Sequence, residues 1–299
     1  MVIDEIDLSI IRRLEYRGRF FLNRVREELK LEEEEVEKRI ARLEGEGLIR
    51  GYRVSLLLPS LLGGRWIWAA ALLITDSEDR VEGRIRERIT YSTEFIYNET
   101  LPWGVGANLV VLFYTQDLRK SLEEFKRTEG VEWVELYKIK EYSFPIALQL
   151  SKEEIQLIEA LKASPKPEPL TQSFNPSWVE AKLDRLIWRE ESPEGIIFVL
   201  PEFNWEVVSN FLHIHFFLEA STDLKPILDK EGFQMVSYGN KFRDRYFQIE
   251  SDVWGFDEFT RRVHTLKKIK GVKLSGLSFW RGNRVESSWV GDVIRKGGV

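Results

Sequence analysis

The sequence VEKRIARLEGEGLIRGY, at residues 36–52, combines a helix, the end of that helix and the beginning of a strand. Its apolar residues are spaced three and four apart, which predicts the buried face of a helix over Glu32–Glu44. Gly45 and Gly47 follow directly, and glycine is typical of a helix end because it adopts positive φ without strain. The loose alternation over Arg50–Leu58 then predicts a strand.

Two shorter helices are predicted upstream of this segment. One extends from Asp4 to about Tyr16, and the other covers Leu22–Leu29. Asp4 suits the N-cap position of the first helix, and Asp7 completes an acidic first turn. Three short helices followed by a strand predict a winged helix-turn-helix over residues 1–60.

The N-terminal segment resembles the Lrp/AsnC (feast/famine) transcription regulators. The resemblance is carried by the opening ID-x-x-D at residues 3–7, an apolar helix, a glycine before the second helix, and V-x-x-R-I-x-R-L-E-x-x-G-L-I-x-G-Y at Val36–Tyr52. It covers roughly residues 2–144. It implies that a ferredoxin-like domain follows the winged helix and serves dimerisation and the binding of a small effector.

Residues 61–146 have the element order that this resemblance implies. The order strand, helix, strand, strand, helix, strand is typical of the ferredoxin-like fold. The predicted elements are Trp66–Thr75, Val81–Ile89, Thr93–Leu101, Asn108–Tyr114, Leu118–Glu129 and Val131–Tyr137.

The second half of the chain repeats both domains in degraded form. WVEAKLDRLIWREE from Trp178 has the apolar spacing of EVEKRIARLEGEG from Glu35, which predicts a second winged helix over residues 147–203. The proline-rich segment Ser164–Pro169 is expected to be a stiff loop within it. Residues 204–299 are predicted to form a second ferredoxin-like domain. The fold class is therefore α+β, with the winged-helix and ferredoxin-like pair present twice.

The second ferredoxin-like domain is predicted from element order alone. Its elements are the strand Asn210–Ala220, the helix Leu224–Glu231, the strands Phe233–Tyr238 and Arg243–Glu250, the helix Phe256–Leu266 and the strand Val272–Trp280.

The resemblance implies binding to double-stranded DNA, because the third helix of a helix-turn-helix enters the major groove while flanking cations hold phosphates. The candidate DNA-binding residues are Arg24, Arg26, Lys38, Arg39, Arg42, Arg50 and Arg53. Four consecutive glutamates, Glu32–Glu35, argue against this function, and residues 1–60 carry 12 Lys+Arg against 13 Asp+Glu, a net charge of −1. The alternative is a winged helix that serves packing or contact with another protein.

The resemblance also implies an effector pocket at the loop between two strands of the first ferredoxin-like domain. Pro102, Trp103, Gly104 and Gly106 would line it. The alternative is a simple β-hairpin.

The chain of 299 residues contains no cysteine, which excludes disulfides, thiolate zinc sites and cysteine nucleophiles. Its three histidines are His213, His215 and His264. We therefore expect no catalytic residue, no metal site and no cofactor, and we interpret His213 and His215 as ordinary residues of a sheet.

An enzyme is the strongest rival interpretation. The sirohaem decarboxylases resemble the same regulators and also occur as paired or fused halves. That family tends to place histidine and arginine in the second strand of the ferredoxin-like domain, whereas the corresponding Glu94–Glu99 has no histidine. In the second half, Tyr238, Lys241, Arg243 and Arg245 could face an anionic ligand.

Composition and charge suggest the setting of the protein. The acidic N-terminus is unlike a signal peptide, and no segment approaches the roughly 18 uncharged apolar residues of a membrane helix. We expect a cytoplasmic homodimer with no membrane partner. The absence of cysteine and the many Glu, Lys and Arg residues resemble proteins from hot environments. The net charge of −5 means that any DNA binding needs a local basic surface.

Overall fold

The computed structural model describes residues 1–15, 17–62, 65–99, 107–139, 150–188, 194–220, 224–231, 233–241 and 244–297. The chain divides into two compact units. The first contains Met1–Trp66, Ser143–Val207 and Arg284–Val299, and the second contains Ile67–Tyr142 and Val208–Asn283. Among the described residues, no helix combines the length and the apolar character needed to cross a lipid bilayer.

The first unit begins with the predicted helix-turn-helix. Its helices are α1 (Glu5–Leu14), α2 (Leu22–Leu29) and α3 (Glu33–Gly45), followed by the strand β1 (Ile49–Leu56) and the short helix α4 (Pro59–Leu62). The apolar positions that predicted these helices are fully buried, among them Ile10, Leu14, Val25, Ile40 and Leu43. The structure therefore confirms three helices and a strand in this order.

The same unit contains a second set of helices. It comprises α7 (Lys152–Ala163), α8 (Pro167–Ser173) and α9 (Pro176–Leu186), the strand β6 (Ile197–Phe203), a 3-10 turn at Trp205–Val207 and the C-terminal helix α12 (Val290–Gly297). The prediction of a stiff loop over Ser164–Pro169 is wrong from Pro167 onward, where α8 begins. Proline is tolerated in a first helical turn because the N–H that it lacks has no partner there.

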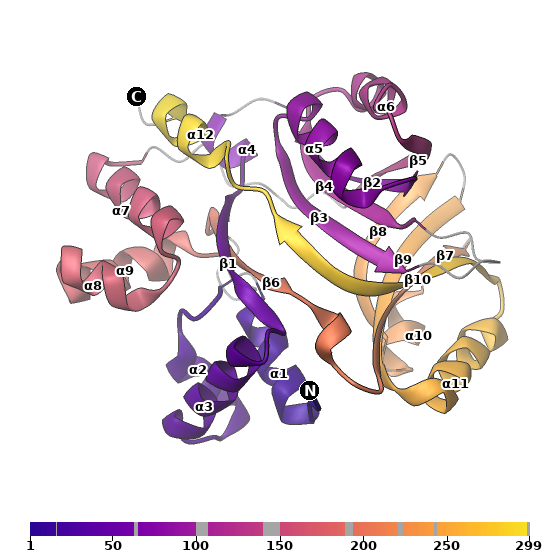
Figure 1. The fold of residues 1–299 in the computed structure, drawn as a ribbon, viewed down its shortest axis with the longest axis horizontal. Helices are drawn as coiled ribbons and strands as arrows, with labels where there is room; N and C mark the ends of the chain where they lie inside the picture. Colours follow the sequence, from indigo (N-terminus) through magenta and orange to yellow (C-terminus); the bar gives the residue numbers. More distant parts are fainter. Residues whose placement is uncertain are drawn as a thin grey trace. The chain divides into compact units, whose positions relative to one another are not determined.

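Each helix-turn-helix contributes one strand to a shared ribbon. β1 pairs with β6 in antiparallel fashion, from Ile49 opposite Phe203 to Leu56 opposite Ile197. Figure 1 shows this ribbon between α1–α3 on one side and α7–α9 on the other. The strand predicted as the wing thus pairs with the other half of the chain.

The second unit contains two βαββαβ segments. The first comprises β2 (Ile67–Thr75), α5 (Glu78–Arg88), β3 (Ser92–Glu99), β4 (Leu109–Thr115), α6 (Leu118–Lys126) and β5 (Val131–Lys138). The second comprises β7 (Phe211–Ala220), α10 (Lys225–Lys230), β8 (Gln234–Lys241), β9 (Asp244–Trp254), α11 (Gly255–Lys268) and β10 (Val272–Val285).

Together the eight strands form one sheet in the order β5-β2-β4-β3-β10-β7-β9-β8. Both halves have the same internal strand order, which confirms the predicted repetition of the ferredoxin-like pattern. The halves join where β3 lies beside β10 (Figure 1).

Strand alternation gives each half of the sheet two different faces. In β7, Ile214 and Phe216 belong to a core that includes residues of α10 and α11. Their neighbours His213, His215 and Phe217 therefore point to the opposite face, on which the described residues place no helix. Phe217 belongs to a cluster with apolar residues of β2, β3 and β4, so the helix-free faces of the two halves meet inside this unit.

Candidate nucleic-acid interface

The first turn of α1 is closed by a capping box. The Asp4 carboxylate accepts a hydrogen bond from the Asp7 N–H at 2.8 Å, and the Asp7 carboxylate accepts one from the Asp4 N–H at 3.0 Å. The predicted N-cap is thereby confirmed. Asp7 is only 1% exposed. A buried carboxylate needs positive partners, since desolvation disfavours an isolated charge.

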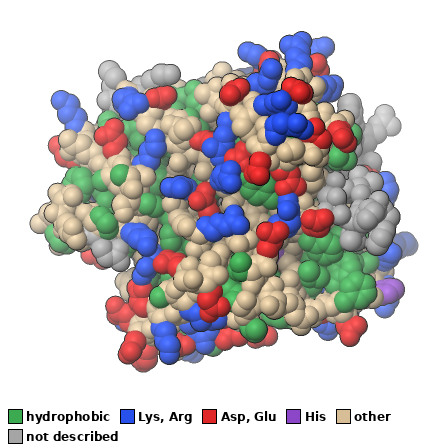
Figure 2. Space-filling model, viewed as in Figure 1, with side chains coloured by type: hydrophobic (Ala, Val, Ile, Leu, Met, Phe, Trp, Pro, Cys, Tyr) green, Lys and Arg blue, Asp and Glu red, His purple; other side chains and the backbone are tan. Residues whose placement is uncertain are grey.

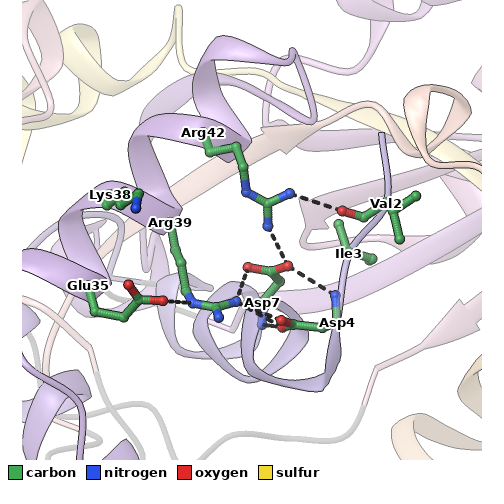
Figure 3. Close-up of a pocket in the computed structure, with 8 residues that line it drawn as sticks. All are labelled: Val2, Ile3, Asp4, Asp7, Glu35, Lys38, Arg39 and Arg42. Atoms are coloured by element: carbon green, nitrogen blue, oxygen red, sulfur yellow. Dashed lines mark hydrogen bonds and ion pairs between the residues drawn. The ribbon is translucent and has the colours of Figure 1, made fainter.

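Two arginines of α3 provide those partners (Figure 3). Arg39 Nη1 lies 2.9 Å from Asp7 Oδ1, and Arg42 Nη2 lies 2.5 Å from Asp7 Oδ2. Arg39 also contacts Asp4 at 2.9 Å and Glu35 at 2.6 Å. We call Asp4, Asp7, Arg39 and Arg42 the first clamp. It connects the start of α1 to one side of α3.

The electrostatics of the first clamp favour the charged forms of Asp4 and Arg39. Burial raises the pKa of Asp4, but the hydrogen bonds from the Asp7 N–H and from Arg39 outweigh it, so the pKa lies below its usual range. The hydrogen bond to Asp4 raises the pKa of Arg39, with smaller contributions from Glu35 and Asp7, and outweighs the lowering effect of burial. Both groups are therefore ionised at neutral pH.

The second helix-turn-helix repeats the clamp with different residues. Ser151 and Glu154 form a capping box at the start of α7, and Glu154 is 3% exposed. Lys182 Nζ lies 2.9 Å from Glu154 Oε1, and Arg185 binds the same oxygen. We call these four residues the second clamp.

The two clamps correspond position by position. The sequence alignment of α9 on α3 places Lys182 on Arg39 and Arg185 on Arg42. Each pair is three residues apart on the third helix and reaches the buried acid in the first turn of the first helix. The sequence contains the two parts of each clamp as separate patterns, a capping box and a basic pair. Only the fold shows that the two parts are in contact.

A surface hollow of about 340 Å³ lies at the first clamp (Figure 3). It is lined by Val2, Ile3, Asp4, Asp7, Glu35, Lys38, Arg39 and Arg42. Three cations and three carboxylates balance in this lining, so the hollow offers no net positive charge to an anion.

The remaining five predicted DNA-binding residues have a different environment. Arg24 pairs with Asp184 at 2.8 Å, Arg26 with Glu33 at 3.2 Å and Arg53 with Glu202 at 3.5 Å, and their side chains are 37–55% exposed. Lys38 and Arg50 are exposed and have no ion pair among the described residues. Surface pairs contribute about 0–1 kcal/mol, so these arginines can exchange their partners for phosphates.

Acidic side chains occupy the start of the same helix. Glu32, Glu33 and Glu34 are exposed, and three glutamates stand in the first turn of α3. Figure 2 shows Lys and Arg interspersed with Asp and Glu on the face in view, rather than gathered into one basic surface. Any nucleic-acid contact would therefore involve few cations.

The predicted effector residues, Pro102, Trp103, Gly104 and Gly106, lie outside the described residues. The strands on either side are joined near this loop. The Asn98 N–H donates to the Asn108 carbonyl at 2.8 Å, and the Asn98 side chain donates to the Ala107 carbonyl at 3.3 Å. The effector pocket stays a prediction.

No protein-family model and no curated protein matches this sequence. Among solved structures, the chain is similar to the siroheme decarboxylase NirDL at 11% identity, over 98% of each chain, with a TM-score of 0.47. It is similar to AsnC of E. coli at 15% identity, over 50% of this chain and 99% of that one, with a TM-score of 0.29. For LrpC of B. subtilis the identity is 17%, the coverage 48% and 99%, and the TM-score 0.32. The structural neighbours thus include Lrp/AsnC regulators and a decarboxylase, and at these values they assign no function.

Proposed function

We propose that the chain is a DNA-binding transcription regulator of the Lrp/AsnC type that contacts duplex DNA through its first helix-turn-helix. The observation that carries this proposal is a group of five cations on α2, α3 and β1, of which three are exposed and the two on α2 are half-buried. The members are Arg24, Arg26, Lys38, Arg50 and Arg53. These elements form one helix-turn-helix with its strand, in which the outer side of α3 is the surface that would approach the major groove.

The second helix-turn-helix lacks an equivalent group. α8 and β6 contain no lysine or arginine, and the two cations of α9, Lys182 and Arg185, belong to the second clamp. One chain therefore offers one DNA reader. A homodimer would supply the two readers that a palindromic site requires.

The same repetition supports an internal duplication with domains at residues 1–60, 61–146, 147–203 and 204–299. Both halves have the same strand order in the sheet and the same clamp in the helices. In this proposal the second helix-turn-helix has kept the clamp, which holds its fold, and has lost the exposed cations.

The proposal is tested by binding-site selection with the purified full chain at two salt concentrations. If all five cations contact phosphates, the logarithm of the binding constant should fall with the logarithm of salt with a slope of about −4.5 per reader. The double variant Lys38→Ala plus Arg50→Ala should weaken binding to every sequence and reduce the slope by about 2.

The matched control removes two exposed cations from the other compact unit. Lys120→Ala plus Lys267→Ala changes the net charge equally and should leave binding unchanged. Equal losses in both double variants, or the absence of salt-dependent binding by the unaltered protein, would reject the proposal.

A protein-binding role for the first helix-turn-helix is the second candidate. It is favoured by the exposed glutamates at the start of α3, which suit a basic partner better than phosphates. Pull-down from a DNase-treated lysate with the full chain, compared with a Glu33→Gln plus Glu34→Gln variant, distinguishes this role. A partner that is lost only in the variant would support it.

The alternative of a tetrapyrrole enzyme is not supported by β3. The sirohaem decarboxylases tend to place histidine in this strand, and this chain has none there. Titration with sirohaem under reducing conditions should therefore leave the absorbance spectrum of the pigment unchanged. A saturable spectral shift at one equivalent per chain would restore this alternative.

A further inference from the structure

Two histidines occupy adjacent positions on the helix-free face of β7. His213 and His215 are two residues apart in the strand, so they share a face. In the antiparallel pairing with β9, His213 lies opposite Asp252 and His215 opposite Glu250. The histidines are 6% and 2% exposed, respectively. Four groups that can bind cations are thus gathered in the interior of the second unit.

The neighbouring strand β10 covers this group with aromatic and neutral side chains. The Trp280 ring centroid lies 4.5 Å from that of His213 and 5.5 Å from that of His215. Ser278, also of β10, is buried and lies opposite His215. The four ionisable residues named here come from β7 and β9.

The distances distinguish one hydrogen bond from a set of longer contacts. His213 Nδ1 lies 2.6 Å from Asp252 Oδ1, which is a hydrogen-bond distance and fixes the imidazole ring. Glu250 Oε2 lies 3.6 Å from His213 Nε2 and 3.9 Å from His215 Nε2. Neither of these separations is a good hydrogen bond. Yet the three ligand atoms all lie within 4.8 Å of one another.

Two of these separations are close to those found around a tetrahedral cation. Metal–nitrogen and metal–oxygen bonds of about 2.1 Å at the tetrahedral angle place two ligand atoms roughly 3.4 Å apart. Both Glu250 distances exceed that separation by no more than about half an ångström. The Asp252 carboxylate at the other nitrogen of His213 is the arrangement with which proteins orient a metal-binding imidazole.

The group is largely shielded from solvent. Both carboxylates face His213, and the side chains of Asp252 and Glu250 are 9% and 14% exposed. His215 is buried, and its Nε2 lies 3.9 Å from Glu250 Oε2. Its Nδ1 has no hydrogen-bond partner among the described residues.

We propose that His213, His215 and Glu250 bind a divalent transition-metal cation of the Zn²⁺ class, with Asp252 as the residue that orients His213. Two imidazole nitrogens and one carboxylate oxygen are a donor set that such cations favour. Three protein ligands leave a fourth position for water or a small ligand. This inference is independent of DNA binding, and it replaces the expectation of no metal site that followed from the low histidine count.

The test uses the tag-free full chain, first stripped with a chelator, and Zn²⁺ or Co²⁺ as the probe. Competition with a chromophoric chelator should give one equivalent of Zn²⁺ per chain, and Co²⁺ should produce the visible absorption bands of a tetrahedral site. The background is low because the chain has no cysteine and one further histidine. The metal is supplied both to the native protein and during refolding, since the site is buried.

Substitution of the proposed ligands tests whether the cation binds at this position. His215→Gln and Glu250→Gln should each abolish the Co²⁺ spectrum, and Asp252→Asn should weaken Zn²⁺ affinity about 10- to 100-fold. His264→Gln removes the exposed histidine of α11 and should change nothing. Absence of stoichiometric binding, or binding that survives loss of His215, overturns the proposal.

A structure of the wild-type protein keeps the proposal testable if a variant does not fold. Crystals grown with Zn²⁺ should show an anomalous peak between His213, His215 and Glu250. Peaks located only elsewhere, or no peak, overturn the proposal.

Discussion

The first and second clamps each pair a buried acid with two cations, but they use different residues. Comparing them distinguishes cations that stabilise the fold from cations that are available to a ligand. Asp7 is paired with two arginines and shares Arg39 with Asp4 and Glu35. Glu154 is paired with Lys182 and Arg185, whose side chains are more exposed. Outside the clamps, α2, α3 and β1 contain cations, whereas α8, α9 and β6 contain none. A basic pair on a third helix is therefore weak evidence for DNA binding until its acidic partners are known.

Removal of the clamp acid should have the largest effect, and it should differ between the halves. Asp7→Ala leaves Arg39 and Arg42 without their buried partner and opens the capping box, so we expect a loss of about 3 kcal/mol in the free energy of unfolding. Glu154→Ala should cause a smaller loss, about 2 kcal/mol, because water can solvate Lys182 and Arg185 more readily. Urea denaturation of each full-length variant measures both values.

The control for this pair is Asp79→Ala, which removes an exposed acid from the first turn of α5 and should change stability by less than about 0.5 kcal/mol. If Asp7→Ala behaved like this control, the clamp would have no structural role, and Arg39 and Arg42 would return to the set of DNA-binding candidates.

Acid should weaken both clamps over a similar pH range. Burial raises the pKa of Glu154, but hydrogen bonds from the Ser151 N–H, Lys182 and Arg185 outweigh it, so the net shift is downward, as for Asp4. A lowered folded-state pKa stabilises the protein above the unfolded-state value, which is about 4 for these carboxylates. That stabilisation should disappear as pH falls from about 5 through the lower folded-state pKa.

Urea denaturation between pH 7 and pH 3 tests this dependence. In Asp4→Asn the contribution of that residue should be absent, so stability should fall less steeply below pH 5 than in the unaltered protein. A variant with an identical slope would show that Asp4 contributes nothing to the clamp.

The smallest effect is expected for a variant of α3 that distinguishes DNA binding from protein binding. Glu33→Gln plus Glu34→Gln removes two exposed negative charges beside the proposed DNA surface, so affinity for duplex DNA should rise roughly three- to tenfold at low salt. Fluorescence anisotropy with a labelled duplex measures the change. Glu132→Gln plus Asp257→Asn, two exposed acids of the other unit, should give no increase. Lower affinity in the glutamate variant would contradict a phosphate-facing α3.

The sequence predicted the elements whose apolar spacing is regular. The helices around Ile10, Ile40 and Leu183, and the repeated order of strands and helices along the two ferredoxin-like halves, follow from local periodicity. The helix over Pro167–Ser173 was missed because its prolines suggested a loop, and α12 was not predicted at all. In both cases tertiary packing determines whether a short helix forms.

The features on which the proposals rest depend on long-range contacts. No local pattern indicates that β1 pairs with β6, that Asp7 receives Arg39, or that Glu250 lies opposite His215. The sequence predicted Lys38, Arg39 and Arg42 alike as DNA-binding residues, because all three are cations on one helix. It did not indicate that Arg39 and Arg42 pair with Asp7. From the sequence we interpreted His213 and His215 as ordinary sheet residues, since their carboxylate partners are more than thirty positions away.

The β1–β6 ribbon has a consequence for how the protein is made. When β1 leaves the ribosome, more than a hundred residues must still be synthesised before its partner strand β6 begins. During that interval Val54 and Leu56, buried in the finished protein, belong to a strand without a neighbour. Such an unpaired apolar edge is prone to association with other chains. The nascent protein should therefore depend most on chaperones between the synthesis of β1 and that of β6, well before its last helix exists.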